Sequence, residues 1–298
     1  MDVLTACVVG VLAGAHTATW GMYKDAAHEG FELRKYFRSI VLSGTIAPGL
    51  VLAGFDIAGI GSLLVLFGVT YVLERAINEF YKTFLRDEDQ SKYFIPMQFT
   101  VRGRPVSRRA RLQVGAAYVL VAAVLLVVVL WLQQWIGPDP GAATVLAVGS
   151  IGGWCSAFGG AWKDAPIEGF EWRKFFRSPV LAALYALALS AFTDSLVLAG
   201  LGGLGFTVAT LETYKTFFFP SKPRGKFAGK PVAFPAMLQR RYWFVPLYAG
   251  IWVLLLAGFA AGSMGERPDA AGTAGRAAPP SGLDEQLEVH RGTPGGAQ

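Results

Sequence analysis

The chain alternates long apolar runs with short, strongly charged segments. Residues 114–136 contain no charged side chain, and seven other mainly apolar segments occur along the sequence. A run of about 20 apolar residues matches the hydrocarbon thickness of a bilayer. We therefore expect an all-α integral membrane protein. The expected apolar segments are 3–20, 40–54, 57–73, 114–136, 142–161, 180–200, 201–218 and 242–261.

Two pairs of these segments are adjacent, so each pair is either one long helix or a hairpin of two. Hairpins place the long polar loops on one membrane face, which then carries 24 of the 27 Lys and Arg residues. Basic residues concentrate in cytoplasmic loops, so charge favours the hairpins. Turn residues are available at Gly54-Phe55-Asp56 and in GLGGLG from Gly200. The sequence predicts about eight transmembrane helices, cytoplasmic charged loops, both termini outside and a bacterial inner (plasma) membrane location.

A dense charged motif occurs twice. KDAAHEGFELRKYFRSI spans 24–40 and KDAPIEGFEWRKFFRSP spans 163–179; aligning 21–41 with 160–180 gives 14 identical positions of 21. YKTF also recurs, from Tyr81 and from Tyr214. This pattern indicates a tandem repeat. We expect two four-helix repeats, 1–136 and 137–262, and a disordered tail, 263–298. An even number of helices per repeat makes the repeats parallel, with a pseudo-two-fold axis along the membrane normal.

Small residues recur at every fourth position of the first segment in each repeat, at Gly10 and Gly14 and at Gly149 and Gly153. Such stripes allow helices to approach closely within a membrane. We expect these two helices to lie in the interior, near the pseudo-two-fold axis.

The acidic residues of the motif are candidate metal ligands. On a continuous helix they would fall at i, i+4 and i+7, on one stripe, although Gly30 and Gly169 weaken any helix there. Three carboxylates can hold a hard divalent cation, which makes Mg²⁺ the candidate cofactor. The candidate metal ligands are Asp25, Glu29, Glu32, Asp164, Glu168 and Glu171.

The basic residues that follow are candidate substrate ligands, because Arg and Lys bind phosphates and anionic head groups. The alternative is structural: the same bases would pair with the preceding acids and fix the loop. Two lysines after the third segment of each repeat join the candidate set. The candidate substrate-binding residues are Arg34, Lys35, Arg38, Arg173, Lys174, Arg177, Lys82 and Lys215.

Three classes of function fit these features. A transporter or channel for an anionic or lipid-phosphate species uses both charged loops, since a pathway lined by two pseudo-symmetric halves needs both. The alternatives are a membrane enzyme acting on a phosphorylated lipid at the cytoplasmic interface and a structural or assembly protein. The excess of basic residues fits charge sorting across a membrane, so the expected partners are membrane lipids with anionic head groups and not nucleic acid. The sequence does not determine the oligomeric state.

Overall fold

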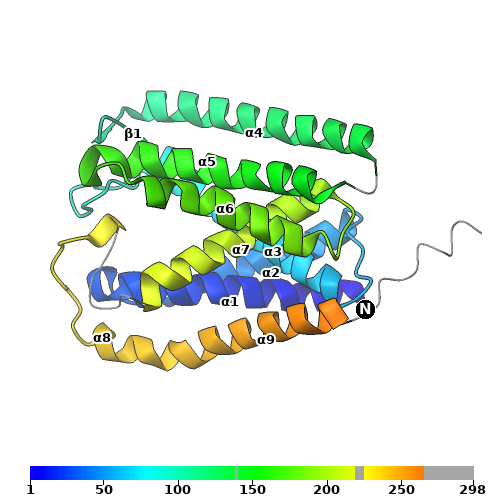
Figure 1. Cartoon of the computed structure of the whole chain (residues 1–298). Coiled ribbons are helices and arrows are strands. Elements are labelled where there is room, and N and C mark those ends of the chain that lie inside the picture. Colours follow the sequence, from blue (N-terminus) through cyan, green and yellow to red (C-terminus); the bar gives the residue numbers. More distant parts are fainter. Residues whose placement is uncertain (138–139, 219–224, 265–298) are drawn as a thin grey trace, which may run out of the picture. The chain divides into compact units, whose positions relative to one another are not determined.

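A computed structural model describes residues 1–137, 140–218 and 225–264. Most of these residues are helical, and Met1–Gly262 form one compact unit (Figure 1). The expected disordered tail lies outside the described residues from 265 onward. The elements are α1 Asp2–Glu29, α2 Leu33–Leu52, α3 Ile60–Phe80, the π-helix η1 Tyr81–Leu85, β1 Thr100–Val101, β2 Arg104–Pro105, α4 Arg108–Ile136, α5 Ala142–Glu168, α6 Trp172–Leu189, α7 Leu196–Phe217, the 3₁₀-helix η2 Gly225–Phe227, α8 Met237–Arg240, the 3₁₀-helix η3 Arg241–Phe244 and α9 Val245–Met264.

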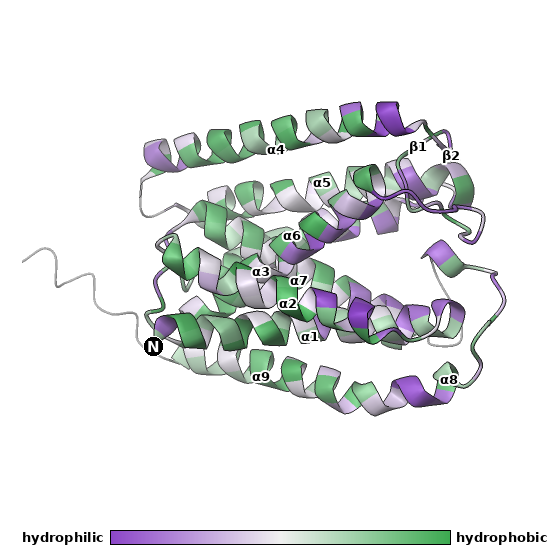
Figure 2. Ribbon diagram, turned by 180° about the vertical axis from the view of Figure 1, so that it is seen from behind, coloured by the Kyte–Doolittle hydropathy of each residue, from purple (hydrophilic) through white to green (hydrophobic). Residues whose placement is uncertain are grey.

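Six helical segments are long and apolar enough to span a membrane, as in an integral membrane protein. They contain α1, α3, α4, α5, α7 and α9. The other two expected spans correspond to α2 and α6, which begin with the charged ends of the two motifs. Figure 2 shows that hydrophilic ribbon concentrates toward the end of the bundle that carries β1, β2 and α8.

A glycine divides each charged motif between two helices. Gly30 (φ 77°) ends α1, and Gly169 (φ 85°) ends α5, in a backbone region that glycine adopts without steric cost. Glu32 and Glu171 are consequently the N-cap residues of α2 and α6. The continuous acidic stripe is therefore wrong: two acids end one helix, and the third begins the next.

Two separate helices occupy each pair of adjacent apolar segments, and one of the two expected turns is misplaced. Residues 53–59 separate α2 from α3, as expected. In the second half, residues 190–195 separate α6 from α7, and the GLGGLG sequence lies inside α7. Gly202 and Gly203 within it are buried, because the absence of a Cβ lets other helices approach.

The small-residue stripes pack within each half of the chain. A Cβ at Gly14 would lie 2.6 Å from the Ser39 carbonyl oxygen of α2. A Cβ at Gly153 would lie 2.5 Å from the matched Ser178 carbonyl oxygen of α6. The stripes are thus buried, as expected, but they join α1 to α2 and α5 to α6.

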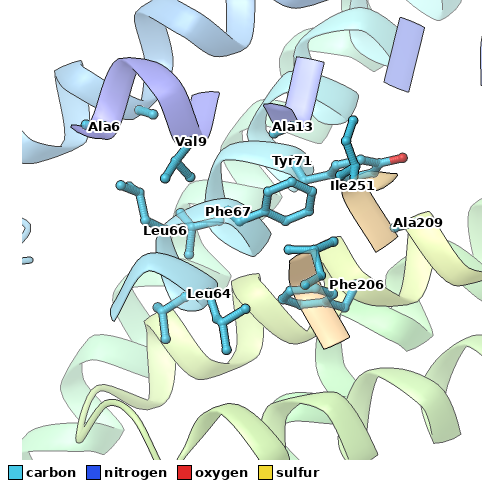
Figure 3. Packing of buried hydrophobic residues seen from close by; sticks show 14 of the residues in the cluster. Ala6, Val9, Ala13, Leu64, Leu66, Phe67, Tyr71, Phe206, Ala209 and Ile251 are labelled. Atoms are coloured by element: carbon cyan, nitrogen blue, oxygen red, sulfur yellow. The ribbon is translucent and has the colours of Figure 1, made fainter. Parts of the chain in front are cut away.

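The two halves meet where α3 crosses α7. A Cβ at Gly68 would lie 2.7 Å from the Gly202 carbonyl oxygen. The same crossing contains Phe67 and Phe206, whose ring centroids are 5.7 Å apart. Figure 3 shows Phe67 packed among residues of α1, α7 and α9. The closest approach between the two halves is therefore made by α3 and α7, and not by α1 and α5 as the sequence led us to expect.

Candidate functional site

A cavity of about 630 Å³ lies between the two halves, at the charged ends of the helices. Eight basic and five acidic side chains line it, so its wall carries an excess of positive charge. Helices from both halves contribute these residues. The charged lining residues are Lys24, Asp25, Arg75, Glu79, Lys82, Lys163, Asp164, Glu171, Lys174, Arg177, Glu212, Lys215 and Lys226.

Two glutamates from the repeated helix ends neutralise part of this charge. Glu212 of α7 accepts from Lys215 at 3.2 Å and from Lys24 of α1 at 3.4 Å. Its counterpart Glu79 of α3 pairs with Arg75 and accepts from Lys82 at 3.4 Å. Each glutamate therefore holds the lysine three residues further along its own chain segment.

Lys163 differs from its counterpart Lys24 in its contacts. It matches Lys24 in the repeated motif, yet it forms no ion pair within the described residues. Its amine lies 3.7 Å from the Met97 sulfur, a weak acceptor. Lys163 is therefore a cation on the cavity wall without a bound carboxylate.

The second lysine of each motif, Lys35 or Lys174, has carboxylate partners. Lys35 pairs with Glu32 at 2.8 Å and with Glu29 at 4.0 Å. Its counterpart Lys174 pairs with Asp164 and with Glu168, each at 3.0 Å. These contacts support the structural alternative for Lys35, which lies outside the cavity lining. Lys174 lines the cavity but is already neutralised.

The arginines of the motifs differ from Lys35 and Lys174 in their exposure and in their contacts. Arg34, Arg38 and Arg173 are exposed, lie outside the cavity lining and form no ion pair with the rest of the described chain. Arg177 instead lines the cavity, 5.9 Å from the ring centroid of Tyr214. The candidate substrate ligands are thus divided: Lys82, Lys215, Lys174 and Arg177 reach the cavity, and the other four do not.

The acids at the end of α1 bind a lysine from the second half. Lys226 of η2 lies 2.8 Å from Asp25 and 3.3 Å from Glu29. Burial lowers the pKa of Lys226, but the two carboxylates raise it by more, so its pKa lies above the ordinary value. The Tyr93 hydroxyl also donates to Glu29, at 3.2 Å. This end of α1 therefore binds loops from both halves.

The acids do not gather as metal ligands. Among residues 1–137, 140–218 and 225–264, no group of three or more His, Cys, Asp and Glu side chains is placed to hold a metal ion. Asp25, Glu29, Asp164 and Glu168 contact lysines instead. Magnesium binding by these acids stays a prediction.

The candidate set from the sequence missed four basic residues of the cavity. Lys24 and Lys163 open the two copies of the motif, so their identity was a signal available in the sequence. Arg75 and Lys226 have no such signal, since Arg75 aligns with Val208 and Lys226 reaches Asp25 from far along the chain. Helix packing alone brings these two residues to the cavity.

Comparison with protein-family models, characterised proteins and solved structures found no significant match.

Proposed function

We propose that the chain forms two tandem four-helix repeats in a bacterial inner membrane, with α2 and α6 as the seventh and eighth spans. The arrangement α1–α4 and α5–α9 would then be parallel, related by a pseudo-two-fold axis near the α3–α7 crossing. The repeated motif and the matched packing of Gly14 and Gly153 support this arrangement. The positive-inside tendency places the charged end of the bundle in the cytoplasm and both chain termini outside.

Within that frame, we propose that the protein transports an anionic or lipid-phosphate species through the cavity between the halves. The observation that carries this proposal is the contrast between two matched lysines. Lys24 is neutralised by Glu212, whereas Lys163 lines the same cavity and forms no ion pair with the described carboxylates. A buried or half-buried ammonium group is costly without a counter-charge, so an anion bound at Lys163 would be stabilised.

The surrounding charges suit reversible binding of that anion. Glu79, the counterpart of Glu212, is already held by Arg75 and Lys82. An incoming phosphate group would therefore compete little with Glu79 for Lys163. Residues of both halves line the cavity, as a transport pathway between pseudo-symmetric halves requires.

The structural or assembly role is the second candidate, and the pairing of Lys35 with Glu32 and Glu29 favours it. Under that role the motif fixes the helix ends and the cavity holds no mobile anion. The transport measurement described next distinguishes the structural role from transport.

The test is transport by the purified full chain in proteoliposomes. One measurement follows transbilayer movement of a fluorescent phosphatidylglycerol, and the other follows uptake of radiolabelled inorganic phosphate. We expect one of the two to be catalysed, and Lys163→Gln to reduce it about tenfold, which corresponds to ~1.4 kcal/mol of lost binding. Lys35→Gln is the matched control, since Lys35 lies outside the cavity and should change the rate less than about twofold.

Movement of neither probe, with folded protein in the vesicles, would contradict transport of phosphate-bearing species. Hydrolysis of the lipid probe in place of movement would favour the enzyme alternative.

A further inference from the structure

The matched helices α1 and α5 differ in the size of the side chains that they carry toward neighbouring helices. In the first half, His16 and Trp20 of α1 both contact the Tyr71 hydroxyl, at 3.1 Å and 2.9 Å. His16 also stacks on Tyr248 of α9, with ring centroids 4.2 Å apart, and Trp20 is only 6% exposed. Four large side chains therefore fill the space between α1, α3 and α9.

The matched positions of the second half carry smaller side chains. The motif alignment replaces His16 by Cys155 and Trp20 by Gly159, and the spacing of the two YKTF sequences replaces the tyrosine by Leu204. These three residues of the second half all line the cavity. A Cβ at Gly159 would meet no atom of the described chain within 4 Å. The second half therefore leaves open a space that aromatic side chains fill in the first.

This space forms an apolar part of the cavity beside α5. Phe84 of η1 and Tyr118 of α4, whose ring centroids are 5.9 Å apart, also line it. We call the part of the cavity that is lined by Phe84, Tyr118, Cys155, Gly159 and Leu204 the apolar arm. Its walls are mainly hydrocarbon and aromatic, in contrast to the charged end of the same cavity.

The apolar arm reaches the side of the bundle where α4 runs alongside α5, as Figures 1 and 2 show. Toward one end of this pair of helices, Val129 of α4 packs against a cluster that contains Val145 and Val148 of α5. Nearer the charged end, Tyr118 and Cys155 line the cavity instead. Both helices are apolar enough to span a membrane. A lipid tail can therefore reach the arm from the bilayer.

The apolar arm adjoins the cation on which the proposed function depends. Gly159 precedes Lys163 by four residues within α5, so the two positions lie on one face of the helix, one turn apart. Lys163 lines the same cavity and forms no ion pair with the described carboxylates. One face of α5 thus places open apolar space next to a positive charge.

We infer that the cavity binds a phospholipid, with its phosphate at Lys163 and an acyl tail in the apolar arm. The ammonium group attracts phosphate, and the apolar walls match a hydrocarbon chain. Inorganic phosphate would leave the arm unfilled, and the side chains around an empty apolar space lose dispersion contacts. This inference rests on the proposed function and narrows its cargo to a lipid, as opposed to a free anion.

The two native cysteines provide a test that needs no substitution. Cys155 lies in the apolar arm, whereas Cys7 of α1 lies outside the cavity lining. The measurement is the rate at which N-ethylmaleimide modifies each cysteine of the purified full chain, in a detergent with an uncharged head group, followed by mass spectrometry of peptides. The probes are dioleoylphosphatidylglycerol, dihexanoylphosphatidylglycerol and inorganic phosphate.

We expect the dioleoyl lipid, at ten times its dissociation constant, to slow modification of Cys155 about tenfold, since about nine-tenths of the sites are then occupied. The rate at Cys7 should not change. The dihexanoyl lipid and inorganic phosphate carry the same charged group without a long tail, so they should leave Cys155 reactive.

Gly159→Trp is the matched variant, because Trp20 occupies the corresponding position in the first half. It should fill the apolar arm and abolish retention of dioleoylphosphatidylglycerol in native mass spectrometry. Gly21→Trp is the control: a Cβ at Gly21 meets no described atom within 4 Å, and Gly21 lies outside the cavity lining. This variant should retain the lipid.

Three results would overturn the lipid site: equal slowing of Cys155 by inorganic phosphate, equal slowing of both cysteines by the dioleoyl lipid, or no slowing at all. Lipid retention by a folded Gly159→Trp variant would overturn it as well. Protection of Cys155 does not require transport. Failure of both vesicle probes to move would therefore reject the proposed function alone, and phosphate uptake with an unprotected Cys155 would reject the lipid site alone.

Discussion

Lys24 Nζ lies 3.4 Å from Glu212 Oε2, and this ion pair links the first half of the chain to the second. The two side chains retain 20% and 15% of their exposure, so solvent screens the pair only in part. Glu212 also holds Lys215. The carboxylate is therefore shared between a contact inside α7 and a contact between the halves.

Removing this carboxylate should destabilise the contact between the halves. Glu212→Gln leaves two lysines without a counter-charge, and we expect a loss of about 1–3 kcal/mol in stability. The measurement is thermal unfolding in detergent of the wild type, Glu212→Gln, Lys24→Gln and the double variant. A coupling energy of about 1 kcal/mol in this cycle would confirm the pair. Additive effects of the two single variants would contradict it.

The α3–α7 crossing should not tolerate a side chain at Gly205. A Cβ there would collide with the Gly68 carbonyl oxygen, which belongs to the backbone and cannot rotate away. We expect Gly205→Ala to cost about 1–3 kcal/mol despite the higher helix propensity of alanine. Gly250→Ala is the control, since a Cβ at Gly250 meets nothing within 4 Å. Equal melting temperatures for the two variants would show that the halves do not meet at this crossing.

The exposed arginines of the motifs should affect lipid binding and not stability. Arg34 and Arg173 form no ion pair with the described chain, so Arg→Gln changes at these sites should alter stability by less than about 0.5 kcal/mol. We expect the double variant to retain fewer phosphatidylglycerol molecules in native mass spectrometry. Lysine replacements should restore binding only in part, because an ammonium lacks the guanidinium fork. Unchanged lipid retention would indicate that these arginines are not head-group ligands.

The proposed topology predicts which sites an impermeant thiol reagent reaches in intact cells. In a background without Cys7 and Cys155, a cysteine at Ser107 should be shielded, because we propose that the charged end of the bundle faces the cytoplasm. Cysteines at Ala58, in the α2–α3 turn, and at Ser263 should be labelled. Ser221, which lies outside the described residues, belongs to a segment that the sequence predicts to be cytoplasmic, so a cysteine there should be shielded as well. Labelling at Ser107 would overturn the proposed orientation.

The helical class could be predicted from the sequence, because long apolar runs indicate it. The helix limits were less predictable, since α1 continues to Glu29 and α5 to Glu168, beyond the expected ends at 20 and 161. The sequence also misplaced the second hairpin turn, because GLGGLG has turn composition but serves close packing of α7. The stripe of Asp25, Glu29 and Glu32 required a continuous helix, and the structure ends α1 at Glu29, with Gly30 as its C-cap.

The ion pairs around the cavity could not be predicted from the sequence. Lys24 and Lys163 are identical in the motif, and only the three-dimensional placement of Glu212 and Glu79 shows that one is paired and the other is not. The partner of Asp25, Lys226, comes from the opposite half of the chain. Ion pairs between distant helix ends depend on packing that local patterns do not encode.

A density map of the full chain in phosphatidylglycerol nanodiscs would show whether Lys163 binds a mobile anion in the cavity. We expect density for a phosphate-bearing group between the halves, within hydrogen-bonding distance of Lys163 Nζ. An ion pair between Lys163 and Glu79, matching that between Lys24 and Glu212, together with an absence of anion density in the cavity, would contradict anion binding at Lys163.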